Sequence, residues 1–165
     1  MRLNDFLVEV GDSPYELSPR WANTGVDIGK SALLPSGKWL DVELDVENRM
    51  ALVNFYVGGK QKITGNGDAI KIFSTVGAAI NDYARKKRPH VIAFTGHIDD
   101  DSRIRLYDRL ANRWLTMPGL KGYVNLTDRK QLWPQDLVSF MDEKQDIRDQ
   151  KIYVLASPVW MRSIA

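Results

Sequence analysis

The stretch KITGNGDAIKIFSTVGAAINDYARKKRPHVIAFT, residues 62–95, places a glycine loop, an amphipathic helix and an apolar strand in direct succession. Its apolar residues recur at three- and four-residue spacing from Ala69 to Tyr83, which predicts a helix with one buried face. The basic run 85–88 followed by Pro89 is typical of a helix C-terminus. The apolar run within 90–95 then predicts a buried central strand, joined in parallel to an earlier strand by a right-handed crossover.

Strands are also predicted before this stretch. Residues 39–46 alternate strictly between apolar side chains and carboxylates, which predicts a half-buried antiparallel strand. A second strand is predicted over 51–57, and the two glycines at 58 and 59 suit a tight turn into a third strand over 60–64. Residues 1–38 mix short apolar pieces with turn formers, and we expect them to be an irregular lead-in.

The second half of the chain predicts one more helix and two closing strands. Three aspartates at 99–101 offer N-cap oxygens to a helix whose apolar stripe runs from Ile104 to Trp114. Residues 122–126 and 151–155 read as strands, with a short helical stretch around Leu137, Phe140 and Met141 between them. The order predicts an α/β fold with a mixed, mostly antiparallel central sheet flanked by helices. Residues 39–165 form this domain, and the whole chain is expected to fold as one unit.

Composition excludes several classes of protein. The chain of 165 residues has 23 basic and 21 acidic side chains, and a formal charge of +2 does not indicate nucleic acid or an anionic membrane as a partner. The absence of cysteine excludes disulfides, thiolate catalysis and cysteine-built zinc sites. No signal peptide and no membrane-spanning run is recognisable, so we expect a soluble, cytoplasmic protein.

Two motifs carry a resemblance to a known family. The segment from Lys62 to Gly67 resembles the glycine loop of the GNAT acyltransferases, and Leu106-Tyr107 resembles a tyrosine motif on a later helix of that family. The resemblance covers roughly residues 39–157. It implies an acyl-CoA-dependent N-acyltransferase with acetyl-CoA as cofactor and an unknown acceptor amine.

The resemblance also implies roles for single residues. Lys62, Gly65, Asn66 and Gly67 would bind the cofactor's pyrophosphate, since glycines permit close approach and amides at a helix N-terminus favour phosphate. Tyr107 would protonate the departing thiolate. The strand before the loop carries no acid, so the candidates for the base are Glu43 and His97.

Each of these features has a simpler structural interpretation. The glycine loop also suits an ordinary strand-to-helix turn, and Tyr107 also suits the apolar stripe of its helix. His97 has only His90 for company, so we expect no metal site. The basic run 85–88 is explained by the helix dipole, so nucleic acid is not the expected partner.

The alternative function is a GNAT-like protein without catalysis. Residues 67–69 and 102–110 resemble small GNAT-like proteins of tailed bacteriophages, which implies a phage protein of the host cytoplasm or the virion. Ala111-Asn112 replaces the family's Gly-Phe, and Asp68 competes with a phosphate for the helix amides. Such a protein would act as a virion structural component or a host-directed binding module. Five tryptophans predict exposed aromatic side chains for a protein partner.

Overall fold

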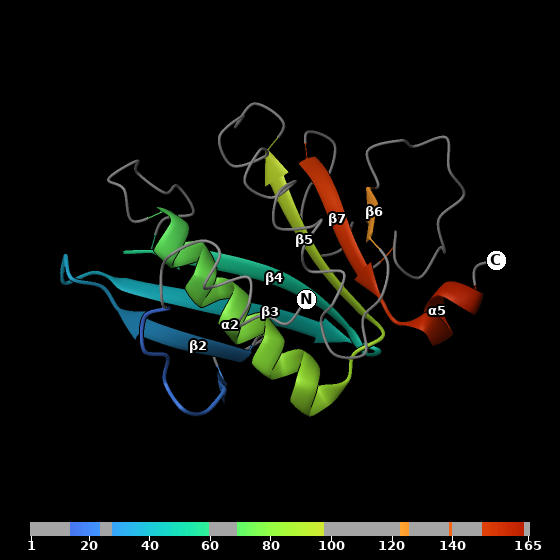
Figure 1. The fold of residues 1–165 in the computed structure, drawn as a ribbon, viewed down its shortest axis with the longest axis horizontal. Coiled ribbons are helices and arrows are strands. Elements are labelled where there is room, and N and C mark those ends of the chain that lie inside the picture. The colour runs from blue at the N-terminus through green and yellow to red at the C-terminus, as the bar shows by residue number, and fades with distance from the viewer. Residues whose placement is uncertain are drawn as a thin grey trace.

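The computed structural model describes residues 14–23, 28–59, 69–97, 123–125, 139 and 150–163. In this part of the chain a sheet contains the strands β1 (Ala22–Asn23), β2 (Ile28–Leu33), β3 (Trp39–Glu47), β4 (Met50–Val57), β5 (Val91–His97), β6 (Tyr123–Asn125) and β7 (Gln150–Ala156). Their order across the sheet is β1-β2-β3-β4-β5-β7-β6, and β4 and β5 are parallel while the other neighbours are antiparallel (Figure 1). The predicted mixed, mostly antiparallel α/β fold is confirmed.

The hairpin of β3 and β4 has the predicted alternation. Leu40, Val42 and Leu44 are fully buried, whereas the carboxylates between them lie on the opposite face of the sheet and are partly exposed. Asn48 and Arg49 form the turn with φ angles of 50° and 62°, and both central residues of a hairpin turn of this kind need positive φ.

Strand β2 corrects part of the expected irregular lead-in. Each of the six residues 28–33 pairs with a residue of β3, from Ile28↔Leu44 to Leu33↔Trp39. Residues 28–33 were not predicted to form a strand, because Gly29 is small and Lys30, a charged residue, occupies a core-facing position. The turn that follows uses Pro35-Ser36-Gly37, with Gly37 at a φ of 82°.

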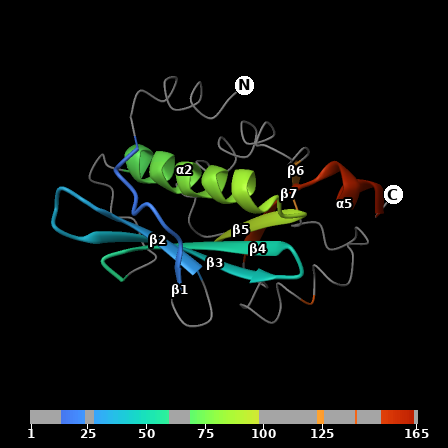
Figure 2. The same ribbon diagram turned by 90° about the horizontal axis from the view of Figure 1, so that it is seen from below.

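Helix α2 (Ala69–Lys87) crosses one face of the sheet, as Figure 2 shows. The predicted apolar stripe faces the strands, and these buried residues include Ile72, Phe73, Val76, Ile80 and Tyr83. The helix ends in three basic residues, after which Arg88 adopts a φ of 46° and its N–H donates to the Ala84 carbonyl. This left-handed residue followed by Pro89 terminates the helix as predicted.

Each face of the sheet carries its own apolar cluster. The larger cluster lies between α2 and strands β2, β3, β4, β5 and β7. The smaller cluster is on the opposite face and joins Leu52, Ala93 and Val154 to the partly buried Trp160. Trp160 belongs to helix α5 (Pro158–Ser163), where its N–H donates to the Ser157 Oγ. Ser157 is thus the N-cap of α5.

Other predicted elements lie outside the described residues: the strand over 60–64, the helix over 104–114 and the helical stretch around Leu137, Phe140 and Met141. The two closing strands are confirmed as β6 and β7. None of the described helices is long and apolar enough to cross a membrane.

Candidate active site

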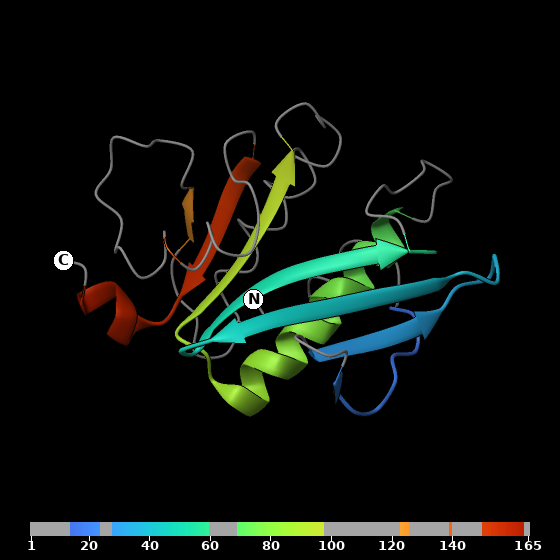
Figure 3. The ribbon, with the colours of Figure 1, turned by 180° about the vertical axis from the view of Figure 1, so that it is seen from behind.

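The main feature of the candidate site is a fork between β4 and β5. The described parallel register between them runs from Met50↔Val91 to Val53↔Phe94. Beyond this point β4 stays paired with β3 as far as Val57, and β5 stays paired with β7 as far as His97. The strands therefore diverge after Val53 and Phe94, and Figures 1 and 3 show them separating towards their C-terminal ends. We call residues 54–57 and 95–97 the strand fork.

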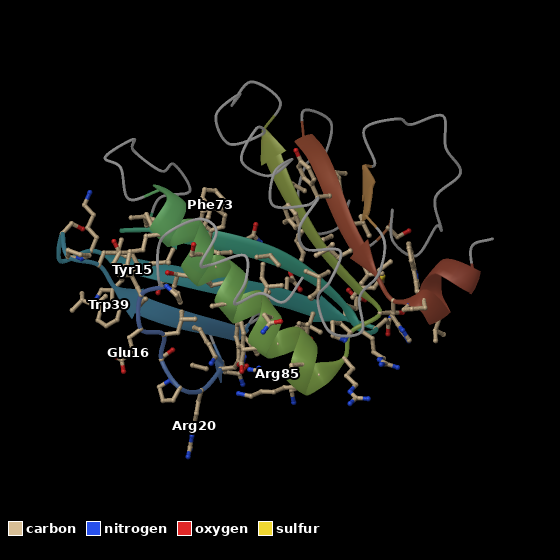
Figure 4. The ribbon with its side chains drawn as sticks, in the orientation of Figure 1. Tyr15, Glu16, Arg20, Trp39, Phe73 and Arg85 are labelled. Atoms are coloured by element: carbon tan, nitrogen blue, oxygen red, sulfur yellow. The ribbon has the colours of Figure 1, made fainter. Side chains whose placement is uncertain are left out.

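On the α2 face, one aromatic side chain is on each strand of the fork: Phe55 lies within the β4 arm and Phe94 lies directly before the β5 arm. Phe55 on β4 makes an edge contact with Phe73 of α2, with ring centroids 5.4 Å apart. Phe94 on β5 stacks on Tyr153 of β7 at 5.0 Å, with an interplanar angle of 3°. Each arm is thus anchored to a different neighbour, which holds the two arms in fixed directions. Phe73, labelled in Figure 4, projects from the first half of α2.

The opposite face of the fork is polar. Asn54 follows Val53 on β4 and is directly opposite Glu43 on β3. Both side chains are partly exposed and lie on the face away from α2. Directly opposed side chains on antiparallel strands have Cβ atoms about 5 Å apart, so Glu43 lies one strand from the diverging edge of β4.

His97 is on the other arm. It is the last residue of β5 and pairs with Gln150 of β7, so β4 separates it from Glu43 in the sheet. The structure therefore places His97 at the end of the β5 arm and Glu43 on β3, next to the β4 arm. Lys62, Gly65, Asn66, Gly67 and Tyr107 lie outside the described residues, and α2 begins at Ala69, directly after the glycine loop and Asp68.

Asn54, the first residue of the β4 arm, is a candidate site residue that was not predicted from the sequence. It interrupts the otherwise apolar or aromatic run of residues 51–57. A lone polar residue in a central strand is a usable signal, because burial of its amide costs free energy unless it finds partners. Only the tertiary structure, however, places this residue where the parallel register ends.

Among the described residues, the carboxylate with the most perturbed pKa is not at the fork. Asp82 of α2 lies 3.1 Å from the Nζ atoms of both Lys30 and Lys86, and Trp21 Nε1 donates to it at 3.1 Å. Burial raises the pKa of Asp82, but these hydrogen bonds and the Lys30 charge outweigh burial and lower it from 3.8 to about 2. The Asp82 cluster therefore joins the N-terminal segment, β2 and α2, and its role is structural.

Where the parallel strands separate, the backbone N–H and C=O groups at their facing edges no longer pair with each other, and an extended ligand can pair with strand edges of this kind. In the described part of the chain, no cluster of three His, Cys, Asp or Glu residues is arranged to hold a metal.

Comparisons with known proteins add the following. No protein-family model and no curated protein matches the chain. Among solved structures, a chimera of the spermidine N-acetyltransferase SpeG from Vibrio cholerae with hSSAT is similar at 13% identity, with a TM-score of 0.48, 98% of this chain covered and 95% of that one. A second chimera of the same two proteins has 12% identity, a TM-score of 0.44 and coverages of 84% and 71%. A single-residue mutant of SpeG has 11% identity, a TM-score of 0.40 and coverages of 100% and 97%.

Proposed function

We propose that the protein is an acyl-CoA-dependent N-acyltransferase whose acceptor is an amine. The observation that carries this proposal is the strand fork, in which parallel β4 and β5 separate after Val53 and Phe94. The connection between them leads through the glycine loop, 65–67, into the N-terminus of α2. An open pair of strands beside a glycine-flanked helix N-terminus suits a ligand with an amide-containing arm and a pyrophosphate.

The proposed roles of the residues in cofactor binding and proton transfer are as follows. Backbone groups of the strand fork would hold the arm of acetyl-CoA, and the amides at Gly65, Asn66 and Gly67, with Lys62, would hold its pyrophosphate. Bound acetyl-CoA would supply the acyl group as a thioester, whose carbon–sulfur bond breaks as the amine nitrogen bonds to the acyl carbon. Glu43 would take the proton of the amine through water, and Tyr107 would give a proton to the departing thiolate.

Binding of the cofactor is the first test of this proposal. We expect calorimetric titration with acetyl-CoA to show saturable binding, and Gly67→Glu to abolish it, because the new carboxylate would occupy and repel the pyrophosphate position. Ser36→Glu is the control, since it adds the same charge in the exposed β2–β3 turn. The absence of binding at millimolar acetyl-CoA would overturn the proposal, as would equal binding by the Gly67→Glu variant.

The role of Glu43 is tested by Glu43→Gln. We expect kcat/KM for an acceptor amine to fall about 100-fold, the lower range for loss of a general base, while binding of acetyl-CoA is unchanged. The loss should shrink as the pH rises and more of the amine is already neutral. Asp45→Asn is the matched control, because Asp45 is on the same face of β3 two residues away. An equal loss in both variants would contradict a specific role for Glu43.

A second function is favoured by one observation. Leu33 and Trp39 are 55% and 52% exposed, although both belong to paired strands. Exposed large apolar side chains of this kind are typical of contact surfaces. A GNAT-like protein without catalysis, acting as a phage structural component or host-directed binding module, would retain this surface while the fork binds no cofactor.

A further inference from the structure

The side of the sheet formed by β2 and the start of β3, away from the strand fork, contains a hollow. It lies between the N-terminal segment 14–20 and the start of β3, and its walls include Glu16, Leu17, Leu33 and Trp39. Its volume is about 370 Å³, at the lower end of the range of roughly 300 to 1,000 Å³ for small-ligand sites. We call it the edge hollow. Figure 4 shows Glu16 and Trp39 on the two elements that border it.

The polar floor of the edge hollow is already hydrogen-bonded within the protein. The Ser18 N–H donates to the Ser31 carbonyl at 2.8 Å, and the Ser31 N–H donates to the Ser18 Oγ at 3.1 Å. The Ser31 hydroxyl donates to Asp41 Oδ1 at 2.7 Å. These bonds fix segment 14–20 against β2, so the hollow is held open by the fold.

The walls of the edge hollow are apolar and aromatic. The half-exposed indole of Trp39 and the side chain of Leu33 are directly opposite each other in the β2–β3 register. Leu17 and Pro19 complete the apolar lining. An apolar stem laid against these side chains would remove their surface from water, which is favourable.

The charge at the edge hollow is negative. Glu16 is an exposed lining residue, and Asp41 lies two residues after Trp39 on the same face of β3. A ligand that combines an apolar stem with a planar cation therefore complements both the indole and the carboxylates. Guanidinium fits better than ammonium, because it stacks on an aromatic face and binds a carboxylate with two parallel hydrogen bonds.

We infer that the edge hollow binds an arginine side chain of a protein partner. This interaction is separate from the proposed acyl transfer, since the hollow and the strand fork are on different strands. Trp39 provides the stacking surface, Leu33 and Leu17 contact the stem, and Glu16 pairs with the guanidinium. Tryptophan and arginine are among the residues that contribute most at protein interfaces.

The test uses Nα-acetyl-arginine-N-methylamide as probe in a ¹H–¹⁵N NMR titration. The reporter is the indole N–H signal that disappears in Trp39→Leu. We expect saturable shifts with the arginine probe, and weaker binding of the norleucine analogue, which has the stem without the charge. Glu16→Gln and Trp39→Leu should each weaken binding of the arginine probe about 2- to 5-fold. Because the leucine variant lacks the indole signal, its binding is measured from the backbone amide signals of residues 28–33.

Glu47→Gln is the control, because Glu47 is an exposed acid at the other end of β3 and should leave binding unchanged. Equal affinity of the arginine and norleucine probes would overturn the inference, as would an unchanged affinity in Glu16→Gln. An unchanged thermal unfolding temperature in the variants would show that any loss of probe affinity comes from the altered side chains at the hollow and not from a damaged fold. Loss of acetyl-CoA binding at the strand fork would not affect this result.

Discussion

Replacing Asp82 by asparagine is expected to lower the free energy of unfolding by about 3 kcal/mol, at the lower end of the range for breaking a buried ion pair. Lys30 is only 6% exposed, and its ammonium lies 3.1 Å from the Asp82 carboxylate. The amide of asparagine keeps the shape but not the charge, so Lys30 would remain buried without the carboxylate of Asp82, with only the Pro19 carbonyl and the Trp21 ring beside its cation. Trp21 would also lose its charged acceptor at 3.1 Å. Urea unfolding followed by circular dichroism measures the loss.

Lys30→Met separates the charge pair from general damage to packing. The cation contacts the Trp21 ring at 5.5 Å from its centroid, and methionine keeps an apolar stem there. We expect the double variant, Lys30→Met with Asp82→Asn, to be more stable than Asp82→Asn alone, since no buried charge is left unpaired. If the losses in the two single variants simply add, the coupling between Lys30 and Asp82 is disproved.

The same carboxylate makes stability depend on pH. The folded-state pKa of Asp82 is about 2 against an ordinary 3.8, so the unfolded chain binds its proton more tightly. A shift of this size corresponds to about 2 kcal/mol. This contribution is complete above pH 3.8 and is lost as the pH falls through 2. Asp82→Asn should therefore show a smaller decline in unfolding free energy between pH 4 and 2 than the parent protein.

Phe94→Ala is expected to lower the free energy of unfolding by about 3 to 5 kcal/mol and to weaken the binding of a ligand at the strand fork. Phe94 is 3% exposed, is the last described β5 residue in register with β4, and stacks on the fully buried Tyr153. Alanine would leave a cavity between the sheet and the residues that cover it. It would also remove the contact that fixes the direction of the β5 arm. Thermal and urea unfolding measure the first effect, and acetyl-CoA titration measures the second.

Phe94→Leu is the comparison for this prediction. Leucine retains most of the apolar volume but not the flat ring, and such swaps usually cost less than about 1.5 kcal/mol. The variant should therefore fold, which allows the ligand titration even if Phe94→Ala does not. A loss of stability as large in the leucine variant as in the alanine variant would show that the aromatic stack, not the volume, is decisive.

Local patterns in the sequence were sufficient for the elements of regular periodicity. The stripe of α2, the alternation of β3 and the apolar run of β5 were predicted, because each repeats the burial of one face along a single element. A parallel connection into β5 was predicted from the rule that parallel neighbours need a long connection, and the structure identified β4 as the partner strand. The glycine loop and Tyr107 remain predictions, since they lie outside the described residues.

Strand β2 shows where such patterns fail. Lys30 occupies a core-facing position that reads as exposed, and it is buried only because Asp82, 52 residues later, neutralises it. No property of residues 28–33 alone reveals that partner. The tertiary structure thus decided that a segment with weak alternation joins the sheet.

The sequence by itself determined the helix, the strands with clear periodicity and the types of residue available for the proposed acyl transfer. Only the tertiary structure decided that β4 and β5 separate after Val53 and Phe94, that Asn54 and Glu43 lie together beside that opening, and that Glu16 and Trp39 share a hollow. The physical reason is that periodicity reports which side of one element is buried. The positions of a fork and a hollow depend instead on register and packing between residues far apart in the chain, which no local pattern encodes.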